Sequence, residues 1–199
     1  MLLINRLKDY KIYLASKSPR RHQLIRDMGI DFEYLPVEVE ENYPAGLTPV
    51  EIAEYLSQLK LLPVNITDFP ENAIFITCDT IVVVNGEIIG KPKDEADAVS
   101  ILKNLSGKEH TVISGLTIAT TKKRLTSHKQ TLVKFKNLSD EEIRYYITHY
   151  KPFDKAGAYG VQEWIGYVAI EYVEGSFYNI MGLPTKLLWE MLEEITIEN

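Results

Sequence analysis

The chain has 199 residues, of which 45% are hydrophobic and 25% are charged. These values are typical of a globular protein and unlike those of a disordered chain. The formal net charge at pH 7 is −6, which argues against a long binding surface for DNA or RNA. A net-negative protein that binds phosphate must therefore concentrate its positive charge in a small region.

The cysteine count and the hydropathy pattern predict the compartment. Cys78 is the single cysteine, so an internal disulfide is impossible and a reducing compartment is favoured. The first eleven residues include Arg6, Lys8, Asp9 and Lys11 and lack the continuous apolar core of a signal peptide. No stretch approaches the roughly 20 apolar residues that span a bilayer. We therefore expect a cytoplasmic protein that does not associate with a membrane.

Hydrophobic periodicity and turn residues predict interspersed strands and helices. A strand is expected at 11–16, followed by a helix that Ser18 caps, that begins at Pro19 and that Gly29 ends. An extended segment at 32–39 and a helix at 49–61 are expected next, followed by strands at 73–84 and 87–89 that the hairpin turn Asn85-Gly86 joins. A helix at 94–105 then precedes strands at 110–120 and 125–136. The last expected elements are a helix from the capping box Ser139-Asp140-Glu141-Glu142 to 149, a turn at 174–176 between 167–173 and 177–181, and a helix from Pro184.

Several of these strands are joined as hairpins. That pattern predicts an α/β fold in which helices flank a mixed β-sheet, not a purely parallel one. We see no internal repeat, low-complexity tract or obvious linker, so a single domain over residues 1–199 is expected.

The segment Ser16-Lys17-Ser18-Pro19-Arg20-Arg21 places two arginines in the first turn of a predicted helix. Cations are mildly unfavourable there, by roughly 0.3–1 kcal/mol each, so the helix does not explain them. A phosphate does, because backbone N–H groups, serine hydroxyls and guanidinium groups would converge where a strand meets a helix. The alternative is a pair of solvated arginines beside a capping serine.

Asp79, followed by Thr80, lies inside the apolar run 74–84. A carboxylate there must be paired, bound to a metal or placed at an opening, because burying an isolated charge is costly. If Asn85-Gly86 is a two-residue turn and Gly90 introduces no bulge, Thr80 pairs with Lys91, and this lysine lies one step from Asp79. An acid and a lysine at the open end of a hairpin suit metal-assisted phosphoryl chemistry. A salt bridge at a strand end is the structural alternative.

Two further segments are candidates for ligand contact. Residues 154–162 contain two glycines, small residues and a polar end at Gln162, which is typical of a loop whose backbone approaches a ligand, or of a plain tight loop. The pair Glu40-Glu41 could supply oxygen ligands to a metal or simply be solvated. Other catalytic plans fit poorly, because the sequence has no P-loop, dinucleotide fingerprint or zinc-type histidine spacing.

Taken in order, these segments resemble the Maf family of nucleoside triphosphate pyrophosphatases, relatives of the inosine triphosphatase fold. The resemblance extends from Tyr13 to about Leu192. It implies two lobes with a central cleft. It rests on Leu14-Ala15-Ser16-Lys17-Ser18-Pro19-Arg20-Arg21, Cys78-Asp79-Thr80, Gly90-Lys91-Pro92, Leu105-Ser106-Gly107, residues 154–162 and Met181-Gly182-Leu183-Pro184.

The resemblance implies hydrolysis between the α- and β-phosphates of dTTP, UTP or modified pyrimidine nucleotides, with a divalent metal cation, Mg²⁺ or Mn²⁺. By position, Asp79 looks like the key acid, either as a general base or as a metal ligand, and Glu41 like a second acid and metal ligand. The resemblance assigns the remaining residues as follows: Lys60 and Lys91 to the catalytic set; Ser16, Arg20 and Arg21 to phosphate binding, to which the local pattern adds Ser18; and Arg20, Thr80 and Gln162 to substrate specificity.

The sequence departs from the family pattern after Gln162, where Glu163 stands in place of a frequent glycine. The context of Lys60 is also looser than the family pattern. The expected partner is a nucleoside triphosphate, with no nucleic acid and no membrane, and the family suggests a homodimer. The alternative function is a nucleotide-binding regulator of cell division with little or no turnover, because the historical family name refers to inhibition of septum formation.

Overall fold

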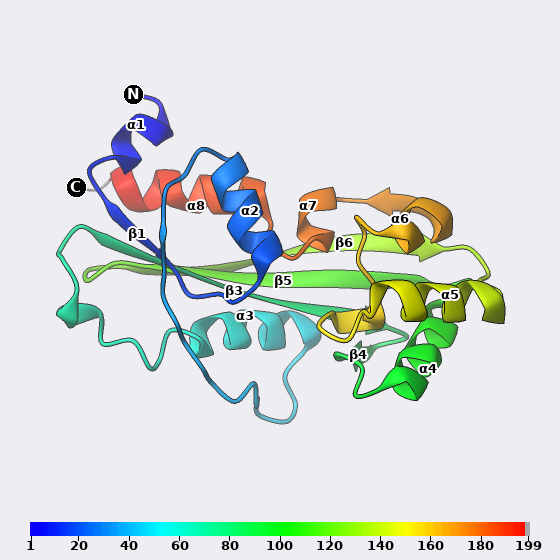
Figure 1. Ribbon diagram of the computed structural model, residues 1–199. Helices are drawn as coiled ribbons and strands as arrows, with labels where there is room; N and C mark the ends of the chain where they lie inside the picture. Colours follow the sequence, from blue (N-terminus) through cyan, green and yellow to red (C-terminus); the bar gives the residue numbers. More distant parts are fainter. Residues whose placement is uncertain (198–199) are drawn as a thin grey trace. The chain divides into compact units, whose positions relative to one another are not determined.

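The structure is a computed structural model that describes residues 1–197 (Figure 1). Its strands are β1 (Lys11–Leu14), β2 (Glu33–Tyr34), β3 (Ala73–Val84), β4 (Glu87–Ile89), β5 (Glu109–Ala119), β6 (Arg124–Phe135) and β7 (Ile170–Glu174). Its helices are α1 (Leu3–Leu7), α2 (Pro19–Asp27), α3 (Pro49–Leu59), α4 (Glu95–Leu105), α5 (Asp140–Tyr150), α6 (Trp164–Ala169), α7 (Phe177–Ile180) and α8 (Thr185–Ile197), with 3₁₀ turns at Ile66–Asp68 and Ala156–Ala158.

The described strands form one seven-stranded sheet in the order β2-β1-β3-β5-β6-β7, and β4 pairs with β3 beside this path. β1 runs parallel to β2 and β3, whereas the β3–β4 and β6–β7 pairs are antiparallel. The predicted α/β fold with a mixed sheet and flanking helices is therefore confirmed.

The chain divides into two compact units. Unit 1 contains Met1–Asp79, Ser114–Lys129 and the described chain from Gly182 onward, and unit 2 contains Thr80–Ile113 and Gln130–Met181. Strand β3 passes from one unit to the other between Asp79 and Thr80. The predicted central cleft stays a prediction.

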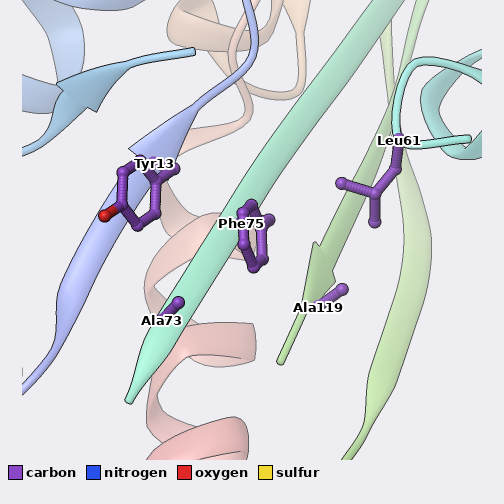
Figure 2. Packing of buried hydrophobic residues seen from close by; sticks show 5 residues of the cluster. All are labelled: Tyr13, Leu61, Ala73, Phe75 and Ala119. Carbon is purple, nitrogen blue, oxygen red and sulfur yellow. The ribbon is translucent and has the colours of Figure 1, made fainter. Parts of the chain in front are cut away.

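The core of unit 1 includes a cluster of Tyr13, Leu61, Ala73, Phe75 and Ala119, shown in Figure 2. The parallel register pairs Tyr13 with Phe75, and their rings stack with centroids 5.4 Å apart. Burial of each large apolar side chain contributes about 1.5–3 kcal/mol. This packing joins β1, which leads into the Ser16–Arg21 segment, to β3, which carries Asp79.

Helix α3 lies directly on the sheet within unit 1, on the face opposite α8 (Figure 1). A Cβ atom at Gly115 of β5 would lie 2.0 Å from the carbonyl oxygen of Ala53 in α3, so only glycine permits this approach. The Ser57 and Thr117 hydroxyls are 2.7 Å apart, and the Thr77 hydroxyl donates to the Ser57 carbonyl oxygen at 2.6 Å. These contacts fix the helix whose C-cap is Lys60.

In unit 2 the predicted hairpin is present. Asn85 and Gly86 have φ angles of 51° and 81°, as a type I′ turn requires. The register pairs Val84 with Glu87 and Val82 with Ile89, as the sequence predicts. Strand β4 ends at Ile89. The pairing expected between Thr80 and Lys91 lies beyond the paired residues of β3 and β4 and stays a prediction.

The structure differs from the sequence-based expectations mainly in segments that depend on tertiary packing. Only Glu33–Tyr34 of the extended segment 32–39 forms a strand. Helix α1, which the sequence pattern did not predict, packs on α8. Leu3 and Leu7 are buried on one face of α1, so packing, not intrinsic propensity, accounts for so short a helix. No helix among residues 1–197 has the length and apolar character needed to cross a membrane.

Candidate active site

The segment Ser16–Arg21, here called the phosphate loop, joins β1 to α2 in unit 1. Ser18 is the N-cap of α2, but within the described chain its side chain forms no capping hydrogen bond. Instead the Oγ atom of buried Ser16 accepts hydrogen bonds from the Ser18 backbone N–H at 3.2 Å and from Arg21 Nη1 at 3.4 Å. Ser16 therefore closes the turn, and the Ser18 hydroxyl is not used as a cap.

The two arginines of the phosphate loop are both half-buried. Arg21 Nε donates a hydrogen bond to the Gly182 carbonyl oxygen at 2.7 Å. The same oxygen is 3.4 Å from the Cys78 sulfur, a weak donor. In the sequence Gly182 is part of a motif similar to the family's, and nothing near it indicates this contact. The guanidinium of Arg21 is therefore fixed from the protein side.

A cluster of one lysine and two acids lies elsewhere in unit 1. The Lys60 ammonium, at the end of α3, forms ion pairs with Asp79 Oδ1 and, at 3.1 Å, with Glu41 Oε1. Asp79 is only 7% exposed. Lys60 offsets the cost of burying this carboxylate, because an unpaired buried charge is strongly unfavourable. The looser sequence context of Lys60 therefore does not prevent it from meeting the key acid.

The acidic residues of this cluster are candidate metal ligands. Glu41 and Asp79 both direct an oxygen to the same ammonium, so two carboxylates converge on one cationic group. Glu40 instead accepts a hydrogen bond from the Asn42 side chain at 3.1 Å, so the side chains of Glu40 and Glu41 contact different groups. Within residues 1–197 no group of three or more His, Cys, Asp or Glu side chains is arranged to hold a metal ion.

Three further predicted site residues belong to unit 2. Thr80 is half-buried, and Lys91 and Gln162 are exposed. Gln162 lines an open pocket of about 480 Å³, together with the exposed aromatic residues Tyr167 and Phe177. Pockets that bind small molecules usually have volumes of about 300–1,000 Å³.

The glycine-containing loop 154–162 packs against the β3–β4 hairpin. The Gly157 N–H donates to the Gly90 carbonyl oxygen at 3.1 Å, next to Lys91. Gly157 has φ 73°, and a Cβ atom there would lie 3.1 Å from Val82 Cγ2. At least one glycine of the loop therefore serves close packing within the protein.

Polar side chains at both ends of this loop and on α5 form a network that the sequence pattern did not predict. Lys155 is 8% exposed and pairs with Asp154 at 2.7 Å and with Glu163 at 3.1 Å. The Tyr146 hydroxyl donates to Glu163 and accepts a hydrogen bond from the Gly160 N–H at 2.9 Å. Burial, followed by the hydrogen bond to Glu163, raises the pKa of Tyr146, so its hydroxyl stays protonated and able to donate.

Comparison with known proteins decides the family. The family model described as "Maf-like protein" matches residues 11–195. The chain belongs to the Maf-like family. A dTTP/UTP pyrophosphatase of Porphyromonas gingivalis is 44% identical over 199 residues, which cover 99% of this chain and 100% of that protein. Proteins of the same name from Flavobacterium johnsoniae and Thermosipho africanus are 47% and 46% identical, over 96% and 92% of this chain and 98% and 92% of theirs.

Membership of the Maf-like family confirms the resemblance drawn from the sequence motifs. The structure brings Glu41, Lys60 and Asp79 together, and in the same unit it places Ser16, Ser18 and the two arginines on one loop. Within unit 1 Asp79 forms an ion pair with Lys60, and the expected position of Lys91 one step from Asp79 stays a prediction. The catalytic and binding roles of all these residues stay predictions.

Proposed function

We propose that this chain is a nucleoside triphosphate pyrophosphatase that hydrolyses dTTP and UTP, and modified relatives of these pyrimidine nucleotides, to the monophosphate and pyrophosphate. The observation that carries the proposal is the Lys60 ammonium, which holds the two acids Asp79 and Glu41 together in the unit that also contains the phosphate loop. Similarity over almost the full length to proteins named dTTP/UTP pyrophosphatase supports the substrate.

The phosphate loop binds the triphosphate in this proposal. A nucleoside triphosphate carries about four negative charges, and the guanidinium groups of Arg20 and Arg21 are suited to bidentate contact with phosphate oxygens. Ser16 and Ser18 add hydroxyl groups at the start of α2, where the helix dipole favours an anion. Lys91 adds a further positive charge, which stabilises the leaving pyrophosphate.

The two acids prepare the attacking water. Its oxygen attacks the α-phosphorus, and the bond from that phosphorus to the oxygen bridging to the β-phosphorus breaks, with the electron pair leaving on pyrophosphate. In one version Asp79 accepts the water proton as general base. In the other, Asp79 acts only as a metal ligand beside Glu41, and the proton of the attacking water passes to solvent. Lys60 keeps the two carboxylates close together in either version.

The residues present fit a divalent cation. Mg²⁺ commonly takes one or two protein carboxylates and completes its coordination with water and substrate phosphates, and Glu41 and Asp79 are such a pair. When bound, Mg²⁺ or Mn²⁺ would neutralise phosphate charge and polarise the phosphoryl oxygens. Removal of divalent cations with EDTA should abolish turnover, and addition of Mg²⁺ or Mn²⁺ should restore it.

Substrate selection belongs in this proposal to Arg20, Thr80 and Gln162. The Gln162 amide offers a donor and an acceptor, which match the carbonyl and N–H groups on one edge of thymine or uracil. We place the enzyme in the cytoplasm, where its nucleotide substrates are found, and we propose a homodimer, which light scattering after gel filtration tests directly. The net charge of −6 supports neither DNA nor RNA as a partner.

One assay tests the function. The protein is incubated with a panel of nucleoside triphosphates and Mg²⁺ or Mn²⁺, and monophosphate and pyrophosphate are measured. We expect both products, with dTTP and UTP preferred. Saturable binding without turnover would favour a nucleotide-binding regulator, and release of orthophosphate with a diphosphate would show that the wrong bond had been assigned. An Asp79→Asn variant as active as the wild type would remove Asp79 from catalysis while leaving the function intact.

A further inference from the structure

The side chain of Glu163 folds back over Gly160. A Cβ atom at Gly160 would lie 2.7 Å from the Glu163 carboxyl carbon and 2.9 and 3.0 Å from its two oxygens. Those oxygens are held by Lys155 at 3.1 Å and by the Tyr146 hydroxyl. The absence of a side chain at Gly160 therefore provides the space that the Glu163 carboxylate occupies.

The Glu163 carboxylate also balances the charge of a buried lysine. Lys155 is 8% exposed, so its ammonium requires an acidic partner. The Asp154 side chain is 59% exposed, whereas that of Glu163 is 25% exposed. Because solvent weakens exposed ion pairs, water screens the Glu163 contact less than the shorter Asp154 contact.

The backbone is held on both sides of Gln162, by the network on one side and by backbone packing on the other. Before it, the Gly160 N–H donates to the Tyr146 hydroxyl at 2.9 Å. After it, Glu163 is the N-cap of α6, and its carbonyl oxygen accepts from the Gly166 N–H at 2.9 Å. A Cβ atom at Gly166 would lie 1.9 Å from the Val161 carbonyl oxygen, so this turn is closely packed. Gln162 lies between these fixed points and lines the open pocket with Tyr167.

We propose that Glu163 is a positioning residue for Gln162. Its carboxylate, held by Lys155 and Tyr146 above Gly160, fixes the loop from which the Gln162 amide meets the pyrimidine base. This inference rests on the proposed function, because it concerns the choice of base.

The test uses two variants that disturb the same carboxylate from opposite sides. Glu163→Ala removes it, and Gly160→Ala displaces it with a methyl group. In each full-length variant we expect the ratio of kcat/KM for dTTP over dCTP to fall about 10-fold, since small misplacements of substrate-contacting groups have effects of this size or larger. The double variant should be no worse than either single variant, because the carboxylate can be lost only once.

Two further variants make the test specific. Glu163→Gln keeps the length of the side chain and an acceptor for Tyr146, so it should retain part of the selectivity that Glu163→Ala loses. Glu171→Ala removes an exposed acid of neighbouring β7 and should leave selectivity unchanged. Urea unfolding of every variant reports stability separately from selectivity.

The outcomes separate the two proposals. Lower stability with unchanged selectivity in both single variants would overturn the positioning role, and additive effects would show that they do not act through one carboxylate. Calorimetric binding of dTTP and dCTP gives the same comparison without turnover. If the wild type binds these nucleotides but hydrolyses none, the proposed function fails, while the binding ratios of the variants still decide the role of Glu163.

Discussion

Arg21 Nε and the carbonyl oxygen of Gly182 are 2.7 Å apart, although 161 positions separate the two residues in the sequence. The contact ties the start of α2 to the segment just before α8. Arg21 also donates to the Ser16 hydroxyl from another nitrogen, at 3.4 Å. A guanidinium group can make both contacts because its donors point in several fixed directions.

Arg21→Lys should therefore damage the site even though it conserves the charge. A lysine ammonium cannot reproduce the fork that meets Gly182 and Ser16 together. We expect kcat/KM for dTTP to fall about 10- to 100-fold and the free energy of unfolding to fall by about 1 kcal/mol. Arg26→Lys is the matched control on the same helix, where the guanidinium lies over the Phe32 ring. Equal kinetics for the Arg21 variant and the wild type would remove Arg21 from the site.

The ion pair between Lys60 and Asp79 predicts unequal effects of single and double substitutions. Lys60→Met leaves the buried Asp79 carboxylate without this ammonium and should lower the free energy of unfolding by about 2–4 kcal/mol. Lys60→Met combined with Asp79→Asn should recover part of this loss, because no buried charge remains uncompensated. Urea unfolding measures Lys60→Met, Asp79→Asn and the double variant. A double variant that is less stable than Lys60→Met would contradict the pairing, and every variant that loses Asp79 should lack turnover.

His110 predicts a pH dependence of stability in unit 2. Burial lowers the pKa of His110 to about 4, from an ordinary value of 6.5. Between these values the unfolded chain binds a proton that the folded chain does not. Stability from this residue is therefore complete above about pH 6.5 and is lost as the pH falls toward 4, by up to about 3 kcal/mol.

The variant His110→Phe isolates this contribution. Its neighbours include the Phe135 and Tyr159 rings, so phenylalanine suits the site apart from the lost contact between His110 Nε2 and the Tyr159 hydroxyl, at 2.8 Å. The stability difference between wild type and variant, measured by urea unfolding from pH 7.5 to 4.5, should shift in favour of the variant as the pH falls. His149→Gln, at an exposed position, should show no such trend. A constant difference across the range would contradict the assignment.

Gly115 should tolerate no side chain. In Gly115→Ala the added methyl group would meet the Ala53 backbone at 2.0 Å, and backbone cannot move aside as a flexible side chain can. We expect a loss of about 3 kcal/mol or more, or failure to fold, because α3 must lift from the sheet. Gly90→Ala is the control for stability, since nothing lies within 4 Å of a Cβ atom there. Thermal unfolding of both variants makes the comparison.

Local signals predicted much of the fold. The capping box at Ser139 and the Asn85-Gly86 turn act within a few residues, so their pattern is visible in the sequence. Strand 73–84 was predicted with the bounds that the structure shows. The short helix α1 was missed, because its buried leucines gain their partner only when α8 packs on them.

The site was predicted as a set of residues more fully than as a set of contacts. The partnership of Lys60 with Asp79 depends on where α3 rests on β5, which Gly115 and the Ser57–Thr117 contact determine. Nothing near Lys60 in the sequence signals that approach. Glu163 was visible as a departure, but its partners Lys155 and Tyr146 come from positions 8 and 17 residues earlier and meet only in the folded loop.

The division of the chain into units sets the order in which the site can be completed during translation. All of unit 2 lies within residues 80–181, whereas the last stretch of unit 1 begins at Gly182. Protein synthesis proceeds from the N-terminus, so every residue of unit 2 leaves the ribosome before Gly182 does. The phosphate loop is made early but obtains the carbonyl that holds Arg21 only near the end. A nascent chain arrested before Gly182 should therefore contain both acids and both arginines and still be unable to process nucleotides.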